Sequence, residues 1–175
     1  MGKVGVPIIG ALKGHVITGG FELALACDIL VGETSTKFRD THVKFGLAPC
    51  WGLSQKLQQK VGPGRAKLAS FTAMPIKADL AYQWGLLDEI CEEGSSSLDR
   101  SIQIADMIGS QNGTMVQRYK RAIVEGGNSD LATGLKRERA LGLAHYLGAM
   151  EDGSTFENAK TYITNDDRPR SQSKL

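Results

Sequence analysis

Long apolar runs, paired cysteines and an excess of charge of one sign are all missing from this sequence. No apolar stretch approaches the roughly 20 residues that a helix needs to cross a membrane, so no membrane span is predicted. The 21 basic and 19 acidic side chains nearly balance, which gives no argument for nucleic acid as a partner. The three cysteines are scattered, without disulfide or metal-type spacing, and favour a reducing compartment.

Histidines are also few, and their positions bear on metal binding. His15, His42 and His145 lack the spacing of metal ligands, so the sequence predicts no metal site. Met1–Pro7 lacks the charged and then apolar layout of a signal peptide. A chain of 175 residues suits one domain with a substantial core.

What the sequence does contain first is a succession of short strands around one helix. Strands are predicted at β-branched stretches and the helix at a run of good helix formers: residues 6–12, 29–33 and 36–38 for the strands and 21–27 for the helix. Residues 39–52, with several Gly and Pro breakers, predict a long loop. Such loops carry function more often than packing.

From Leu53 onward the apolar residues recur with mostly helical spacing. Helices are expected at residues 53–61, 65–73, 77–84, 98–108, 114–124, 131–150 and 155–163. We therefore expect an α/β core over residues 1–92, a helical region over residues 93–163 and a polar tail over residues 164–175.

A glycine pair before the first helix is the first candidate site. Gly19 and Gly20 let the backbone turn sharply and leave free N–H groups at the helix start. Such donors suit an anion or a developing oxyanion, and Glu22 lies beside them in the first turn. A purely structural interpretation is also open, in which Gly19 caps the helix and Glu22 is a favourable first-turn acid.

The predicted loop holds the second candidate. His42 is a natural proton carrier near neutral pH, although a loop histidine can equally be solvated or held by a neighbour. Cys50 lies in the same loop and has no obvious activating partner. The loop therefore leaves a catalytic and a structural interpretation open.

The chain ends on Ser173, Lys174 and Leu175, the tripeptide that a peroxisomal import receptor binds at a free C-terminus. The residues before it are polar, so we expect the signal to be accessible. The sequence therefore predicts a peroxisomal protein with the import receptor as one partner.

Residues 7–28, PIIGALKGHVITGGFELALACD, resemble the signature segment of the crotonase (enoyl-CoA hydratase/isomerase) superfamily. The similarity continues through Phe38, GLAP at residues 46–49 and LSQKL at residues 53–57. The stretch DTHVKFG and the terminal tripeptide resemble the plant peroxisomal members. The resemblance implies an α/β fold, a spiral of ββα units followed by an all-helical C-terminal region.

The resemblance also implies roles for single residues. Gly19 matches the glycine whose N–H polarises the thioester carbonyl, with Gly20 beside it, and Glu22 matches one of two glutamates that hold and activate water. The second glutamate falls at His42, so an imidazole replaces a carboxylate. We therefore expect slower hydration, with double-bond isomerisation relatively spared. Cys50 replaces a family glycine near the acyl chain.

The family's other oxyanion donor and its coenzyme A cradle precede the signature segment. Residues 1–5 contain nothing that matches them, so we expect a shortened family member. One lost oxyanion donor costs about 3–4 kcal/mol in the transition state, and little activity is therefore expected from the chain alone.

In function, the resemblance implies an enoyl-CoA hydratase, a lyase or isomerase of peroxisomal fatty-acid β-oxidation. It implies acyl-CoA thioesters as substrates and no separate cofactor, because coenzyme A is part of the substrate. It further implies a homo-oligomer, a trimer or hexamer built through the C-terminal helices. Two alternatives stay open: a non-catalytic subunit that assembles with intact copies, and an enoyl-CoA double-bond isomerase.

Overall fold

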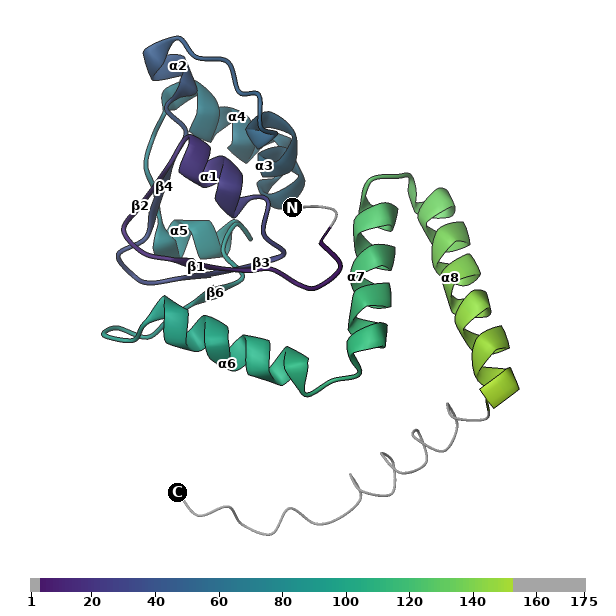
Figure 1. Cartoon of the computed structure of the whole chain (residues 1–175). Coiled ribbons are helices and arrows are strands. Elements are labelled where there is room, and N and C mark those ends of the chain that lie inside the picture. The colour runs from purple at the N-terminus through teal and green to yellow at the C-terminus, as the bar shows by residue number, and fades with distance from the viewer. Residues whose placement is uncertain (1–3, 153–175) are drawn as a thin grey trace. The chain divides into compact units, whose positions relative to one another are not determined.

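The computed structural model of the chain describes the backbone of residues 4–152 and the side-chain exposure of residues 4–147. The chain forms two compact units, Met1–Lys120 and Arg121–Leu175. Within the described residues, the first unit holds all the strands (Figure 1). No helix in residues 4–152 combines the length and the apolar character that a membrane crossing requires.

Two three-stranded sheets organise the first unit. The strands are β1 (Ile9–Leu12), β2 (His15–Ile17), β3 (Ile29–Gly32), β4 (Lys37–Arg39), β5 (Ile76–Lys77) and β6 (Glu89–Ile90). One sheet has the order β1–β3–β6 and is parallel. The other has the order β2–β4–β5, with β2 and β4 parallel and β5 antiparallel to β4. The strands β1 to β4 thus alternate between the two sheets, and a helix follows each of the pairs β1–β2 and β3–β4, which is the repeating ββα arrangement.

Helices form where the sequence supplies an apolar face or a start signal. α3 (Leu53–Val61) buries Leu53, Leu57 and Val61, which share one face at a spacing of four residues. α4 (Pro63–Thr72) begins with a proline, which suits the first helical turn. The other helices are α1 (Gly19–Ala24), α2 (His42–Phe45), α5 (Ala78–Gln83), α6 (Ser97–Gly109), α7 (Gly113–Gly127) and α8 (Leu131–Asp152).

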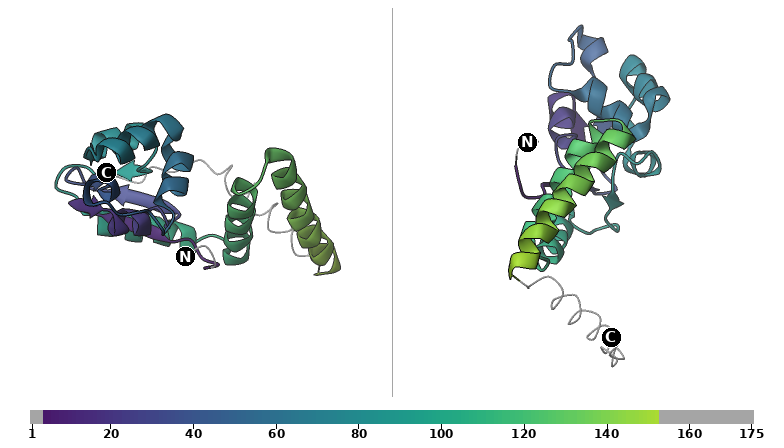
Figure 2. Two further views of the ribbon diagram at one scale, coloured as in Figure 1. Left: turned by 90° about the horizontal axis from the view of Figure 1, so that it is seen from above. Right: turned by 90° about the vertical axis from the view of Figure 1, so that its right-hand side faces the viewer.

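The core of the first unit lies where both sheets meet α1, α3, α4 and α5. Phe21 and Phe38 are fully buried, with ring centroids 5.0 Å apart. Other large side chains that are fully buried in this cluster are Leu30, Leu53, Leu57, Ile76, Leu86 and Leu87. Burial of one such side chain contributes about 1.5–3 kcal/mol. α6 packs against β1 and β3, on the side of that sheet away from α1 (Figures 1 and 2).

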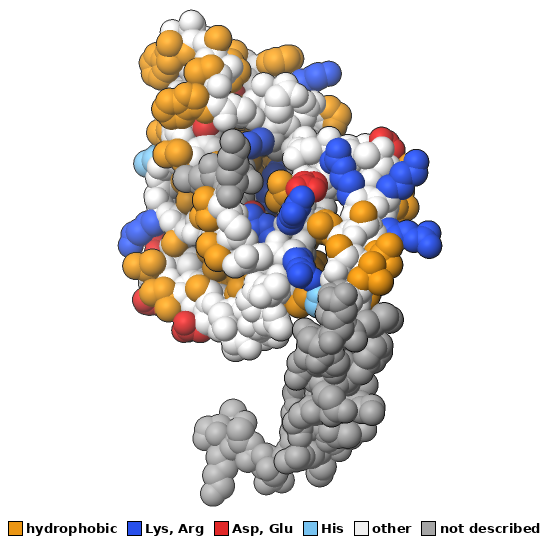
Figure 3. Space-filling model, turned by 45° about the vertical axis from the view of Figure 1, so that its right-hand side comes forward, with side chains coloured by type: hydrophobic (Ala, Val, Ile, Leu, Met, Phe, Trp, Pro, Cys, Tyr) orange, Lys and Arg blue, Asp and Glu red, His pale blue; other side chains and the backbone are white. Residues whose placement is uncertain are grey.

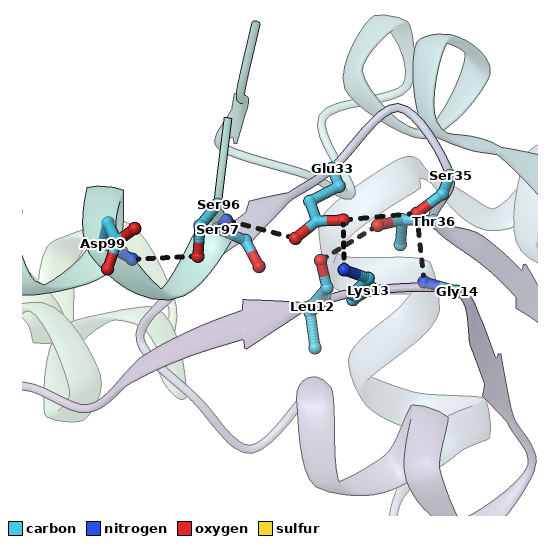
Figure 4. Close-up of polar contacts among 9 residues, drawn as sticks. All are labelled: Leu12, Lys13, Gly14, Glu33, Ser35, Thr36, Ser96, Ser97 and Asp99. Atoms are coloured by element: carbon cyan, nitrogen blue, oxygen red, sulfur yellow. Dashed lines mark hydrogen bonds and ion pairs between the residues drawn. The ribbon is translucent and has the colours of Figure 1, made fainter. Parts of the chain in front are cut away.

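Polar contacts fasten the turns that follow β1 and β3 (Figure 4). Glu33 accepts a hydrogen bond from the backbone N–H of Ser97 at 3.4 Å and pairs with Lys13 at 3.6 Å. The Thr36 hydroxyl donates to the carbonyl of Leu12 at 3.1 Å. These contacts join two strand turns to the start of α6, so they fix the strand ends on which the core depends.

The predicted α/β class, with ββα units first and helices after them, is confirmed. The expected loop over residues 39–52 was wrong in one respect, because it contains the four-residue helix α2, ended by Gly46 at φ +64°. The helix expected at residues 77–84 starts one residue later, because Lys77 pairs with Lys37 in the second sheet.

Along the chain, the first compact unit ends at Lys120 and the second begins at Arg121, so the boundary falls inside α7. α6 is the first helix of the region expected at residues 93–163, yet it belongs to the first unit. The division into residues 1–92, 93–163 and 164–175 stays a prediction. Ser173, Lys174, Leu175 and the helix expected at residues 155–163 lie outside the described residues.

Candidate active site

The turn between β2 and α1 has a strained backbone. Thr18 has φ +47° and ψ −107°, a region that a β-branched residue rarely adopts and that costs about 1–3 kcal/mol. Its N–H donates to the carbonyl of Arg39 at 3.1 Å, and its hydroxyl is hydrogen-bonded to the hydroxyl of Thr41. The end of β4 therefore holds the turn in place. The N–H groups of Gly19 and Gly20 follow at the start of α1, where a helix offers them no internal acceptor.

The Glu22 carboxylate is buried, with only 5% of the residue exposed. Its Oε1 accepts hydrogen bonds from the backbone N–H groups of Trp51 at 3.0 Å and Leu53 at 3.4 Å. Both N–H groups reach one oxygen because Gly52 between them has φ +104°, a conformation that favours glycine. Among the described residues no group donates to Oε2, which is also not a fully buried atom. One oxygen is therefore anchored and the other is free for a ligand.

An indole forms one wall of the glycine turn. A Cβ added to Gly19 would lie 3.4 Å from Cζ3 of Trp51, whereas Gly20 has open space around it. The Trp51 side chain is largely exposed. A group that bound the Gly19 N–H would therefore lie beside an exposed aromatic surface.

His42 begins α2 and is buried, with 6% of the residue exposed. Its Nδ1 lies 2.7 Å from Oδ1 of Asp40, which is 3% exposed. The same Oδ1 accepts a hydrogen bond from the His42 backbone N–H at 3.1 Å. The imidazole is thus held by a buried carboxylate on one side, which leaves Nε2 as the ring nitrogen for other chemistry.

The structure brings the predicted site residues together in part. Gly19, Gly20 and Glu22 occupy the first turn of α1, and the Thr18–Thr41 hydrogen bond joins the neighbours of Gly19 and His42. No hydrogen bond or ion pair links Glu22 with His42 in the part of the chain that the structure describes. Their catalytic roles stay predictions.

Sequence reasoning missed two residues of this region. Asp40 lies two positions before His42, a spacing visible in the sequence but common in loops. Trp51 contributes both its ring and its N–H to the site, and the sequence places it only within the predicted loop of residues 39–52. The Cys50 thiol is free and exposed.

A separate cleft of about 590 Å³ lies between β6 and the start of α6. Glu89, Cys91 and Arg100 line it, and none of the predicted site residues does. Burial raises the pKa of the Cys91 thiol, with a further rise from the charge of Glu89. Within residues 4–152 no cluster of three His, Cys, Asp or Glu side chains could hold a metal ion.

The Gly19 N–H, the free oxygen of Glu22 and the held imidazole of His42 are a set that can polarise a carbonyl and move protons. Residues 1–153 match the family described as enoyl-CoA hydratase/isomerase. The Arabidopsis thaliana protein named "Probable enoyl-CoA hydratase 1, peroxisomal" is 41% identical over 175 residues, all of this chain and 65% of that protein.

Solved structures of proteins described as enoyl-CoA hydratases also superpose on this chain. A Geobacillus kaustophilus enoyl-CoA hydratase subunit superposes with a TM-score of 0.83 at 27% identity, over 99% of this chain and 65% of that one. A Thermobifida fusca protein described as an enoyl-CoA hydratase, in complex with acetoacetyl-CoA, superposes with a TM-score of 0.73 at 29% identity, over 80% of this chain and 55% of that one. The chain thus spans 55% to 65% of the length of these relatives.

Proposed function

Since the chain belongs to the enoyl-CoA hydratase/isomerase family, we propose that it carries the proton-transfer groups of a site that adds water to a 2-enoyl-CoA thioester. The observation that carries this proposal is the buried Glu22 carboxylate, with Oε1 held by two backbone N–H groups and Oε2 free. A buried carboxylate is unfavourable unless it is hydrogen-bonded, and this one is bonded on one side only. The free side supports a chemical role beyond capping α3.

Hydration needs three groups at the double bond. A donor stabilises the negative charge that develops on the thioester oxygen, a base takes a proton from water, and an acid supplies a proton to Cα. In the proposed arrangement these are the Gly19 N–H, Glu22 Oε2 and His42 Nε2, in that order. The Trp51 ring beside Gly19 would shield the thioester from bulk water.

The substrate class follows from the relatives. The Thermobifida fusca structure contains acetoacetyl-CoA, a short acyl-CoA thioester, and supports a substrate of that class here. The name of the Arabidopsis relative and the terminal Ser173-Lys174-Leu175 support a place in peroxisomal β-oxidation, with the import receptor as a partner. We also propose a homo-oligomer of this chain.

Isomerisation is a second candidate function, and His42 is the observation that favours it. An enoyl-CoA isomerase moves one proton between two carbons and needs no bound water. A neutral imidazole in place of a second carboxylate suits such a shuttle. The two activities differ in product, so one experiment distinguishes them.

The test uses the 175-residue chain and a chimera that adds the segment of the Arabidopsis relative that this chain does not cover. Each protein is given crotonyl-CoA and, separately, a 3-enoyl-CoA. We expect hydration of crotonyl-CoA by the chimera and little by the chain alone, because a second oxyanion donor is expected outside it.

Each outcome separates the hypotheses. Conversion of the 3-enoyl-CoA to the 2-enoyl-CoA, with no 3-hydroxyacyl product from either substrate, would assign an isomerase. A folded chimera that binds neither substrate would leave a non-catalytic subunit and contradict the proposal.

A further inference from the structure

We infer that Asp40 is a positioning residue that acts through His42, and that the Asp40–His42 pair does the work of a second carboxylate in the site. This inference rests on the hydratase function proposed above. It concerns a residue to which neither the family resemblance nor the comparisons assign a role.

The contact between the two residues determines how the ring is held. A carboxylate can only accept hydrogen bonds, so Nδ1 at 2.7 Å from Oδ1 must carry the hydrogen. In the neutral ring Nε2 is then the unprotonated nitrogen. Both residues are more than nine-tenths buried, so solvent does not compete for the contact and the ring keeps one tautomer and one orientation.

Charge gives the pair its equivalence to a glutamate. An ionised Asp40 with a neutral His42 carries one negative charge in total, and Nε2 can accept one proton. A single carboxylate has the same charge and the same proton capacity. The imidazole alone has the same proton capacity but carries no negative charge, which is why the sequence by itself indicated a weaker hydratase.

The proton balance of one turnover closes with this pair. The cycle starts with Glu22 ionised and with the Asp40–His42 pair holding its one proton. In this form both ring nitrogens of His42 carry hydrogen, and the pair corresponds to a protonated glutamic acid. Water gives one proton to Glu22 while its oxygen bonds to Cβ, and the double-bond electrons move to form the enolate at the Gly19 N–H. The enolate collapses as the Nε2 proton moves to Cα. Glu22 then returns its proton to His42 through solvent, which restores both groups.

A purely structural role for Asp40 is the alternative. Oδ1 also accepts the backbone N–H of His42 at 3.1 Å, at the start of α2, and the side chain of Thr41 at the N-cap position makes no capping bond. Asn caps helices about as well as Asp. The change Asp40→Asn therefore keeps the backbone hydrogen bond and removes the charge, and it separates the two roles.

The first measurement does not depend on activity. Long-range ¹H–¹⁵N NMR of the 175-residue chain reports which ring nitrogen of each histidine carries hydrogen, with His42→Gln to assign the signal. We expect neutral His42 to be protonated on Nδ1, and the population of this tautomer to fall in Asp40→Asn, because an uncharged amide oxygen is a weaker acceptor than a carboxylate. A wild-type ring protonated on Nε2 alone would overturn the inference.

The second measurement is a double-variant cycle in the active chimera. Asp40→Asn should lower kcat about 10²-fold with KM unchanged. In a His42→Glu background the same change should raise kcat, because Asp40 would otherwise face a second buried carboxylate. A loss of similar size in both backgrounds would mean that Asp40 only supports α2, and unchanged kcat in Asp40→Asn would also overturn the inference.

The two proposals fail in different ways. If the wild-type chimera hydrates no enoyl-CoA, the proposed function fails and the role of the pair in hydration fails with it, while the NMR result still decides whether Asp40 holds the ring. If the chimera is active and Asp40→Asn behaves as wild type, the function stands and the role of Asp40 is refuted.

Discussion

The two oxygens of the Glu22 carboxylate have different surroundings, and this difference can be tested. Oε1 accepts from the N–H groups of Trp51 and Leu53, whereas Oε2 has no donor among the described residues. The carbonyl oxygen of a glutamine could take the place of Oε1 and keep both bonds. The amide nitrogen would then occupy the place of Oε2, where it cannot accept a proton.

Glu22→Gln should therefore lower hydration by the chimera at least about 10²-fold, the usual effect of removing a proton-transfer group. Its thermal midpoint should stay close to that of the wild type. Glu92→Gln is a matched control, because Glu92 is exposed and lines the separate cleft. Hydration at an undiminished rate in Glu22→Gln would remove Glu22 from the mechanism.

Among single residues, the sequence indicated Gly19, Gly20 and Glu22, because a glycine pair before a helix permits a sharp turn and leaves free N–H groups beside the first helical turn. It did not indicate that Glu22 also caps α3, since that contact joins residues about 30 positions apart. Asp40 was missed for another reason. An acid two residues before a histidine is common, and only burial of both residues makes the contact informative.

Among the elements, α1 links the candidate site to the core. Gly19 and Glu22 lie on its first turn, while Phe21 between them is fully buried against Phe38 of β4. The same six residues therefore present the site and fill the centre of the first unit. A cavity at Phe21 should disturb both.

Phe21→Ala should lower the free energy of unfolding by about 3–5 kcal/mol, through lost burial and the cavity left behind. Urea denaturation of the chimera and its variant measures the difference. Phe71→Ala is the control, because Phe71 is 71% exposed and should change stability little. Equal stability of Phe21→Ala and wild type would contradict the assignment of the core.

The junction of β6 with α6 should respond to acid. Glu89 forms an ion pair with Arg100 through both carboxylate oxygens, and this hydrogen bonding lowers the pKa of Glu89 from its ordinary 4.5. A lowered folded-state pKa means that the pair stabilises the fold fully above the ordinary value. Its contribution is lost as the pH falls through the lowered value.

The difference in urea midpoint between wild type and Glu89→Gln should therefore shrink as the pH falls from about 6 to about 3. It should also shrink in high salt, because both side chains are partly exposed. A difference that stayed constant over this pH range would show that the ion pair does not stabilise the junction.

The sequence predicted α3 within its observed bounds because buried residues recur every four positions and Gly62-Pro63 ends the run. The sequence did not predict α2 or β5, and the reason is physical. α2 has four residues, too few for a helical period, and β5 exists because two residues pair with β4. Short elements depend on tertiary contacts that no local pattern encodes.

At the scale of the whole molecule, exposed apolar surface favours self-association. Within the described residues β1 and β2 each lie at the edge of a sheet, and such edges invite pairing with other chains. Val43, Phe45 and Leu47, the α2 patch, are all more than half exposed. Figure 3 shows hydrophobic side chains gathered at this end of the first unit.

The 175-residue chain expressed alone should therefore self-associate, because patches of this kind favour association. Light scattering should show a mass that rises with concentration, and the double change Phe45→Lys and Leu47→Glu should reduce it. The double change Leu131→Lys and Leu135→Glu, at two other exposed leucines, controls for the same pair of added charges. A monodisperse monomer at all concentrations would contradict this expectation.

The proposed peroxisomal import concerns the whole chain, because an import receptor binds a Ser-Lys-Leu tripeptide only at a free C-terminus, and this sequence ends on Ser173, Lys174 and Leu175. A fluorescent protein fused to the N-terminus should therefore enter puncta that carry a peroxisomal marker. One extra residue after Leu175 should leave it diffuse, since the terminal carboxylate moves while every residue of the tripeptide stays. Deletion of the three residues should have the same effect. Puncta that persist in both variants would refute the signal, and diffuse fluorescence in all three proteins would place the chain outside peroxisomes.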